Sequence, residues 1–171
     1  TERKGLEAQR GLFQRMVSPA VIAQLDPDDL DLEGQRVTLT TLFADVRGFT
    51  SYSEVTRPEK LFTLLNAHLR AAVDAILNEE GTIDKFMGDA ILAFWNAPVD
   101  QPDHAARALE TVLAIRVALD AENERREQEN KPPIRVGAGI ETGICSVGNF
   151  GSDIRFDYTA IGSTVNMSAR L

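Results

Sequence analysis

Two aspartates stand beside turns in this sequence, each next to an apolar run. Asp45 ends the run "TLFAD", and Asp89 follows Gly88 in "DKFMGDAILAFW". Two carboxylates on neighbouring central strands suit a pair of hard divalent cations such as Mg²⁺, which take oxygen ligands and share them with substrate phosphates. The plainer alternative is that each aspartate caps its turn or pairs with Arg47 or Lys85, because aspartate is common in turns. The spacing alone leaves both alternatives open.

The segment after Asp45 offers a second chemical group. In "VRGFTS", Gly48 precedes Phe49 and Thr50 just past the apolar run. A glycine with Ser or Thr in such a position, leading towards a helix, presents backbone N–H groups to a phosphate. Next to a carboxylate that binds cations, this segment favours a substrate that contains phosphate.

A third candidate group lies near the end of the chain. Asn166 and Arg170 are four positions apart in "STVNMSARL", which predicts a helix with Ser163 or Thr164 as its N-cap. Residues at that spacing project from one helical face, and a planar guanidinium aimed at a phosphoryl oxygen stabilises developing charge. The plainer alternative is a surface arginine and an asparagine of a helix turn.

These groups need a scaffold, and the hydrophobic pattern predicts helices covering a largely antiparallel sheet. Strands are expected at 36–46, on both sides of a turn at Met87–Gly88, at 134–143, at 144–151 and at 155–162, and "RGFTSYSE" is expected to be a turn. Helices are expected at 58–80, with Gly81 just past the end, and at 103–128. The first 35 residues predict a helix from Leu6 to Leu25 and an acidic connecting loop, "DPDDLDLEG".

The composition narrows the classes of function. A chain of 171 residues, 43% hydrophobic and 26% charged, forms a folded domain, and it has no apolar stretch of the roughly 20 residues that cross a bilayer. The net charge of −8 argues against a sequence-independent nucleic-acid binder but allows a nucleotide whose charge a cation offsets. The lone Cys145 fits a core residue in a reducing cytosol. Without a signal peptide or an initiator Met, the chain is expected to be a piece of a longer protein.

Several long motifs together resemble one family. The signature blocks of the class III nucleotide cyclase catalytic domain, found in adenylate and guanylate cyclases, are similar to "LFADVRGFTSYSE", "GTIDKFMGDAILAFW" and "GIETGICSVGNFGSDIRFDYTAIGSTVNMSARL". The resemblance covers about Val37 to Leu171. It implies an α+β, ferredoxin-like or palm-like domain at 36–171, whose mixed but mainly antiparallel sheet is covered by helices. Residues 1–35 would then be a helix and linker from an upstream regulatory or sensor region.

The resemblance implies roles for the groups near the phosphates. Asp45 and Asp89 match the two metal-binding aspartates, and the carbonyl of Val46 would complete the shell of one ion. The segment 48–50 would bind substrate. The cofactors implied are two divalent cations, Mg²⁺ or Mn²⁺. One would activate the ribose 3′-hydroxyl for attack on the α-phosphorus, and the other would assist the departure of pyrophosphate.

The resemblance also implies roles for the groups near the base and ribose. Lys85 and Thr159 match the two positions that read the purine, and Asn166 and Arg170 match the pair that orients the ribose and stabilises the charged phosphorus centre. A Lys with a Thr implies ATP, and therefore an adenylate cyclase that makes cyclic AMP and pyrophosphate. A threonine hydroxyl both donates and accepts, however, so this pair alone does not exclude GTP.

The family places the metal aspartates and the base-reading residues on opposite sides of a dimer interface. This chain carries both sets, which implies a homodimer with two composite active sites. A guanylate cyclase and a catalytically silent dimerisation or regulatory module are the two alternatives. A diguanylate cyclase is disfavoured because its glycine-acidic turn signature is absent. The catalytic domain is expected to be cytoplasmic, and membrane attachment of the parent protein is open.

Some features depart from the family pattern or stand outside it. Ser163 lies where the family more often carries Asp, although Ser also caps helices well. The family continues past the equivalent of Leu171 with strands that include a triphosphate-binding Lys, so further strands are expected beyond this end. His68 and His104 lie outside the motifs, and no role in the chemistry is expected for either.

Overall fold

The computed structural model describes residues 5, 7, 11, 17–24, 33–152 and 154–171. Most of the helix predicted from Leu6 to Leu25, and all of the acidic loop except its last two residues, lie outside the described residues. Within this region, α2 (Pro19–Ile22) is a short helix. It is attached to the sheet through the Ser18 hydroxyl, which accepts the N–H of Ile83 at 2.9 Å and donates to its carbonyl at 3.4 Å.

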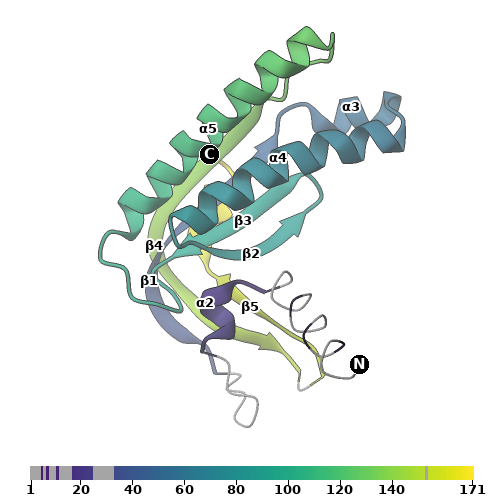
Figure 1. Cartoon of the computed structure of the whole chain (residues 1–171). Coiled ribbons are helices and arrows are strands. Elements are labelled where there is room, and N and C mark those ends of the chain that lie inside the picture. Colours follow the sequence, from purple (N-terminus) through teal and green to yellow (C-terminus); the bar gives the residue numbers. More distant parts are fainter. Residues whose placement is uncertain (1–4, 6, 8–10, 12–16, 25–32, 153) are drawn as a thin grey trace.

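Within the described residues, five strands form one sheet in the order β2-β3-β1-β4-β5, and every neighbouring pair is antiparallel (Figure 1). The strands are β1 (Gln35–Val46), β2 (Thr82–Met87), β3 (Ala90–Trp95), β4 (Val136–Gly151) and β5 (Phe156–Ile161). The remaining helices are α3 (Phe49–Val55), α4 (Pro58–Asn78), α5 (His104–Gln128) and α6 (Ser163–Ser168). The α+β fold expected from the sequence, an antiparallel sheet covered by helices, is confirmed.

β4 runs along the sheet as one long strand, whereas two strands were predicted at 134–143 and 144–151. Its pairing with β1 is unbroken. The glycine at the predicted break has a different purpose, because a Cβ on Gly143 would lie 2.3 Å from Oγ1 of Thr164. Gly143 therefore makes room for α6 to cross the strand, and it does not end the strand.

Two short helices also differ from the prediction. The segment "RGFTSYSE" was predicted as a turn, but most of it forms α3, because Phe49 and Tyr52 lie on one helical face and pack against the core. The last helix has Gly162 as its N-cap, and the predicted caps Ser163 and Thr164 are already helical. Thr164 is buried over the sheet, so its side chain contributes to packing.

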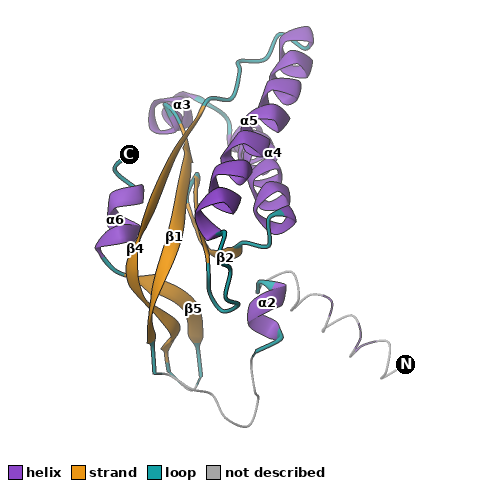
Figure 2. Cartoon of the chain, turned by 90° about the vertical axis from the view of Figure 1, so that its left-hand side faces the viewer, coloured by secondary structure: helices purple, strands orange, loops and turns teal. Residues whose placement is uncertain are grey.

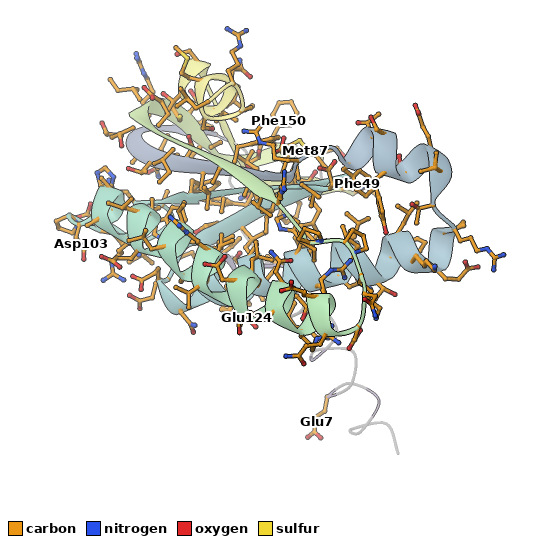
Figure 3. The ribbon with its side chains drawn as sticks, turned by 90° about the horizontal axis from the view of Figure 1, so that it is seen from above. Glu7, Phe49, Met87, Asp103, Glu124 and Phe150 are labelled. Atoms are coloured by element: carbon orange, nitrogen blue, oxygen red, sulfur yellow. The ribbon has the colours of Figure 1, made fainter. Side chains whose placement is uncertain are left out.

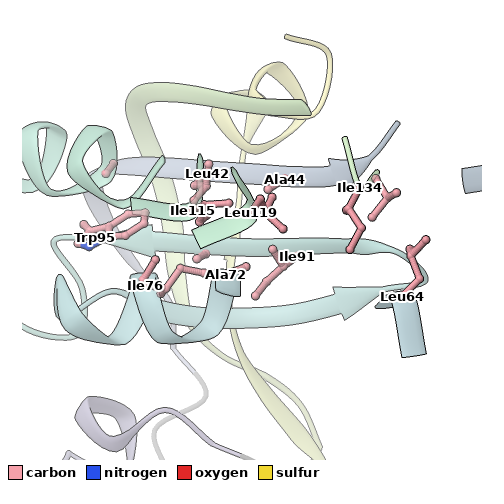
Figure 4. Close-up of a cluster of buried hydrophobic side chains, with 14 residues drawn as sticks. Leu42, Ala44, Leu64, Ala72, Ile76, Ile91, Trp95, Ile115, Leu119 and Ile134 are labelled. Atoms are coloured by element: carbon pink, nitrogen blue, oxygen red, sulfur yellow. The ribbon is translucent and has the colours of Figure 1, made fainter. Parts of the chain in front are cut away.

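The helices form layers on both faces of the sheet. α4 and α5 pack together on one face, and α6 lies on the other (Figure 2). Alternate residues of the central strands fill the space beneath α4 and α5. They include Leu42 and Ala44 of β1 and Ile91 and Trp95 of β3, which form one buried cluster with Ile115 of α5 (Figure 4). The positions between them point to the α6 face, which is where polar groups can gather.

A second, smaller buried cluster contains Cys145 (1% exposed), which confirms the prediction of a core cysteine. His104 is part of the scaffold too, since its Nδ1 lies 2.6 Å from the hydroxyl oxygen of Thr40. None of the helices in the described part of the chain combines the length and apolar character that a membrane span needs.

Gly81, just past α4, is required because neighbouring side chains leave no room for a Cβ atom, and not because of its backbone conformation. The residue with left-handed φ at this helix end is Glu80 (φ 54°). A Cβ on Gly81 would lie 2.7 Å from the indole ring of Trp95 and 2.8 Å from Ile76. Both side chains are fully buried, so neither can move without disturbing the core.

We expect Gly81→Ala to lower the free energy of unfolding by about 1–3 kcal/mol, the typical cost of overpacking a core. Urea denaturation followed by the fluorescence of Trp95 measures this change. Gly34→Ala is the matched control, since a Cβ on Gly34 would make an ordinary contact of 3.7 Å with the carbonyl oxygen of Val147. Equal losses of stability in the two variants would contradict the steric explanation.

Candidate active site

The two aspartates predicted to bind metal meet where β1 ends. Asp45 is the penultimate residue of β1. Asp89 is the second residue of the tight loop between β2 and β3, after Gly88 (φ 61°), so the turn lies one position later than predicted. Oδ2 of Asp89 accepts a hydrogen bond from the N–H of Val46 at 3.0 Å. This bond fixes one carboxylate beside the backbone that carries the other.

Cationic side chains in the described part of the chain do little to neutralise these carboxylates. Nε of Arg47 lies 4.0 Å from Oδ1 of Asp45, and the Arg47 side chain is 60% exposed. Such a long, exposed pair contributes little. Among the described residues, no group of three or more His, Cys, Asp or Glu side chains could hold a metal ion. Two carboxylates and the carbonyl of Val46 instead suit a Mg²⁺ ion that takes its other ligands from water and substrate phosphates.

His68 of α4 lies near the aspartates but adds no positive charge. Burial is the larger effect and lowers the pKa of His68, while the nearby Asp89 and Asp45 carboxylates act in the opposite direction. The Asp89 backbone is close to the ring, yet no hydrogen-bond partner among the described residues meets either ring nitrogen. The lowered pKa favours the neutral imidazole, so His68 is not a cationic partner for the aspartates.

A pocket of about 550 Å³ on the α6 face collects three further predicted residues, Lys85 of β2, Thr159 of β5 and Asn166 of α6. The rest of its lining is apolar or small: Phe43, Met87, Leu92, Phe150, Ala160, Ile161, Gly162, Val165 and Ala169. Figure 3 shows Met87 and Phe150 on the side of the sheet away from Glu124 of α5. The volume and lining are typical of a small-molecule site. Asp45 and Asp89 lie outside this lining.

Asp84, which sequence reasoning missed, contacts two of the predicted site residues, Lys85 and Thr159. Its side chain is fully buried, and Nζ of Lys85 lies 3.4 Å from its Oδ1. It also accepts the Thr159 hydroxyl at 2.7 and 2.9 Å and the N–H of Ala160 at 3.1 Å. Lys85 thus pairs with Asp84, and Asp89 bonds to Val46 instead. A signal was available in "TIDKF", where a carboxylate stands inside a predicted strand.

Asn166 and Arg170 do not share a helical face as predicted. α6 ends at Ser168, and Arg170 follows in a turn, where its N–H donates to the carbonyl of Met167 at 2.9 Å. Asn166 lines the pocket, whereas Arg170 does not. Both side chains are exposed.

The predicted phosphate-binding segment opens α3. Gly48 is the N-cap with φ 71°, a conformation that favours glycine. Phe49 and Thr50 follow in the first helical turn, whose N–H groups have no acceptor within the helix. Phe49 packs against the core, so this segment has backbone groups and the Thr50 hydroxyl to offer a ligand.

The sequence profile described as Adenylate and Guanylate cyclase catalytic domain matches residues 33–171. The chain belongs to this family. Adenylate cyclase 1 of Rhizobium meliloti (strain 1021) is 37% identical over 136 residues, which are 80% of this chain and 20% of that protein. Adenylate cyclase of Anabaena cylindrica is 35% identical over 167 residues, 93% of this chain and 32% of that protein. This cyclase domain therefore spans a fifth to a third of the length of these relatives.

Solved structures agree with the family but differ in the base that they name. The guanylyl cyclase Cya2 matches this cyclase domain with a TM-score of 0.76 and 40% identity, over 81% of this chain and 71% of that chain. The adenylyl cyclase CyaB from P. aeruginosa matches with a TM-score of 0.74 and 42% identity, over 81% and 72%. Overall similarity does not choose between adenine and guanine, so that choice depends on individual side chains.

Proposed function

We propose that the chain is the catalytic domain of an adenylate cyclase, which converts ATP to 3′,5′-cyclic AMP and pyrophosphate in signal transduction. The observation that supports this most is the single pocket that Lys85, Thr159 and Asn166 line from three separate segments. These are the side chains that the family resemblance assigns to the purine and the ribose. Their convergence is what a site for a nucleoside requires.

Each of these side chains has a role that its chemistry supports. Lys85 donates to a ring nitrogen of adenine, and Thr159 contacts the exocyclic amino group. Asn166 holds the ribose. Arg170 lies outside the pocket lining, and the family resemblance assigns it to stabilise negative charge as it develops at the α-phosphate. In the reaction the ribose 3′-hydroxyl loses its proton to water and its oxygen bonds to the α-phosphorus, while the bond from that phosphorus to the bridging oxygen breaks and pyrophosphate leaves. The chain contributes position and electrostatics.

Asp45, Asp89 and the carbonyl of Val46 would hold the divalent cations, Mg²⁺ or Mn²⁺. Bound cations would offset phosphate charge and make the 3′-hydroxyl a better nucleophile. The chain's own contribution is a preset carboxylate, since the N–H of Val46 holds Asp89 at 3.0 Å. The N–H groups of segment 48–50 offer further donors to the phosphates.

We expect two copies of the chain to build two composite sites. Asp45 and Asp89 lie outside the lining of the pocket that the base-reading residues share. The pocket is also rimmed by exposed apolar side chains, with Met87 42% exposed, Phe150 64% and Ile161 51%. Exposed apolar groups gathered around one pocket favour burial against another protein surface. A second copy would cover them and bring its own aspartates to the pocket.

A guanylate cyclase is the second candidate, and the 40% identity to the guanylyl cyclase Cya2 favours it. Initial rates measured with ATP and GTP separately, with Mg²⁺ or Mn²⁺ and at several protein concentrations, distinguish the two. We expect cyclic AMP formation that depends on the cation, a higher kcat/KM for ATP, and a specific activity that rises with protein concentration. A higher kcat/KM for GTP would favour the guanylate cyclase, and no cyclic nucleotide under any condition would favour a silent module.

A further inference from the structure

Asp84 occupies a bulge in β2 that turns its side chain towards Thr159 of β5. Ile83 pairs with Ala93 and Lys85 pairs with Leu92, so Asp84 is the extra residue on its strand. In a regular strand, consecutive side chains point to opposite faces of the sheet. The bulge removes that alternation here. Asp84 consequently reaches Thr159, and Lys85 reaches the pocket that Thr159 lines.

The carboxylate of Asp84 joins the two edge strands of the sheet. β2 and β5 lie at opposite ends of the strand order, yet Oδ2 of Asp84 accepts the Thr159 hydroxyl at 2.7 Å and the N–H of Ala160 at 3.1 Å. A threonine hydroxyl has one proton and two lone pairs. Because that proton is donated to Asp84, only lone pairs of Thr159 Oγ1 remain for a ligand.

The other neighbours of Asp84 keep it an acceptor. The N–H of Ala160 and the ammonium of Lys85 can only donate hydrogen bonds, so Asp84 must accept from both. Burial raises the pKa of Asp84, and the bonds from Thr159, Ala160 and Lys85 oppose that rise. Asp84 also holds the Lys85 ammonium at 3.4 Å beside the pocket, where its remaining hydrogens can point to a base.

We propose that Asp84 is a positioning residue for base selection, which fixes Thr159 as a hydrogen-bond acceptor and thereby favours adenine over guanine. The inference rests on the proposed function, because it concerns how that same pocket reads its base. At position 6 adenine carries an amino group that donates, whereas guanine carries a carbonyl oxygen that accepts. A free threonine hydroxyl could serve either base. When its proton is held by Asp84, the Thr159 hydroxyl can accept a hydrogen bond from the adenine amino group. The guanine oxygen offers no proton, so its lone pairs would face those of Thr159 and repel them.

The test is Asp84→Asn, which keeps the shape of the side chain. Its amide nitrogen can donate to Thr159 Oγ1, so that the hydroxyl proton is free to turn towards the base. We expect the ratio of kcat/KM for ATP to kcat/KM for GTP to fall about tenfold, as the loss of one hydrogen bond to the base predicts. A general loss of stability would lower both values together and leave the ratio unchanged.

Variants of Thr159 separate the hydroxyl from the fold. Thr159→Ser keeps the hydroxyl and is expected to keep the ratio, whereas Thr159→Val removes it and is expected to lower the ratio about tenfold. In the Thr159→Val background, Asp84→Asn is expected to change the ratio no further, because its effect passes through the hydroxyl. Equilibrium binding of non-cyclisable ATP and GTP analogues provides the same ratio without turnover.

The outcomes separate this inference from the proposed function. A wild-type preference for ATP with an unchanged ratio in Asp84→Asn would overturn the inference and leave the adenylate cyclase standing. A wild-type preference for GTP would overturn both. If Asp84→Asn does not fold, an unchanged ratio in Thr159→Val would overturn the inference, because the hydroxyl would then have no part in base selection.

Discussion

Asp45→Asn is expected to lower kcat for cyclic AMP formation about 10³-fold, which corresponds to about 4 kcal/mol of lost transition-state stabilisation. The substitution keeps the shape of the side chain and removes the charge that would hold a cation. It should leave the fold intact, since the Asp45 side chain is 37% exposed and its contact with Arg47 is at 4.0 Å. Steady-state rates with Mg²⁺ and ATP, together with thermal unfolding, measure both effects.

Asp74→Asn is the matched control, because Asp74 is an exposed carboxylate on α4 and is not among the predicted site residues. We expect it to change kcat less than twofold, as is usual for surface positions. Binding of Mn²⁺, followed by electron paramagnetic resonance, should weaken in Asp45→Asn and not in Asp74→Asn. Full activity of Asp45→Asn would instead support the plainer explanation that this aspartate only caps a turn.

The parts of the site that the sequence predicts depend on local patterns. The apolar run before Asp45 indicates a buried strand, and the short spacing around Gly88 indicates a hairpin. Two adjacent antiparallel strands then bring Asp45 and Asp89 to one end of the sheet, as the bond from Val46 to Asp89 shows. Helices α4 and α5 follow from the 3.6-residue period. Such features need no knowledge of distant contacts.

The parts that the sequence does not predict depend on contacts between distant segments. Asp84 and Thr159 are 75 positions apart, and they meet only because the bulge in β2 re-aims the carboxylate towards the opposite edge strand. The long β4 was missed for a similar reason, because the space at Gly143 is needed by Thr164 of a later helix. In both cases the role of a residue is set by a contact with a segment far along the chain.

The contact between Asp84 and Lys85 also shows that Lys85 and Asp89, which belong to one β2–β3 hairpin, do not pair with each other. Lys85 lies in β2 at the pocket with Thr159, and Asp89 in the turn of the same hairpin is held by Val46. One hairpin thus carries the proposed base-reading lysine and the proposed metal-binding carboxylate, each with a different partner. If the two groups serve different active sites of a homodimer, damage to one group should be complemented by an intact copy on the partner.

Mixing Asp45→Asn with Asn166→Ala is therefore expected to restore about a quarter of wild-type activity in the whole mixture, because random exchange makes about half of the dimers mixed and each mixed dimer has one intact site of two. The purified mixed dimer is expected to have about half of wild-type activity. Each variant alone is expected to be nearly inactive. The measurement is the rate of cyclic AMP formation after the two chains are co-expressed with different tags and the mixed dimer is confirmed by tandem purification.

Asp45→Asn mixed with Asp89→Asn is the control for this experiment. Both substitutions fall on the metal-binding half, so every site of that mixed dimer lacks one carboxylate and no activity should return. Asn166 is suited to the complementing half because its side chain is exposed and lines the pocket, so its loss should spare the fold. Mixed Asp45→Asn and Asn166→Ala dimers that form but stay inactive would show that each active site is built within a single chain, against the composite arrangement.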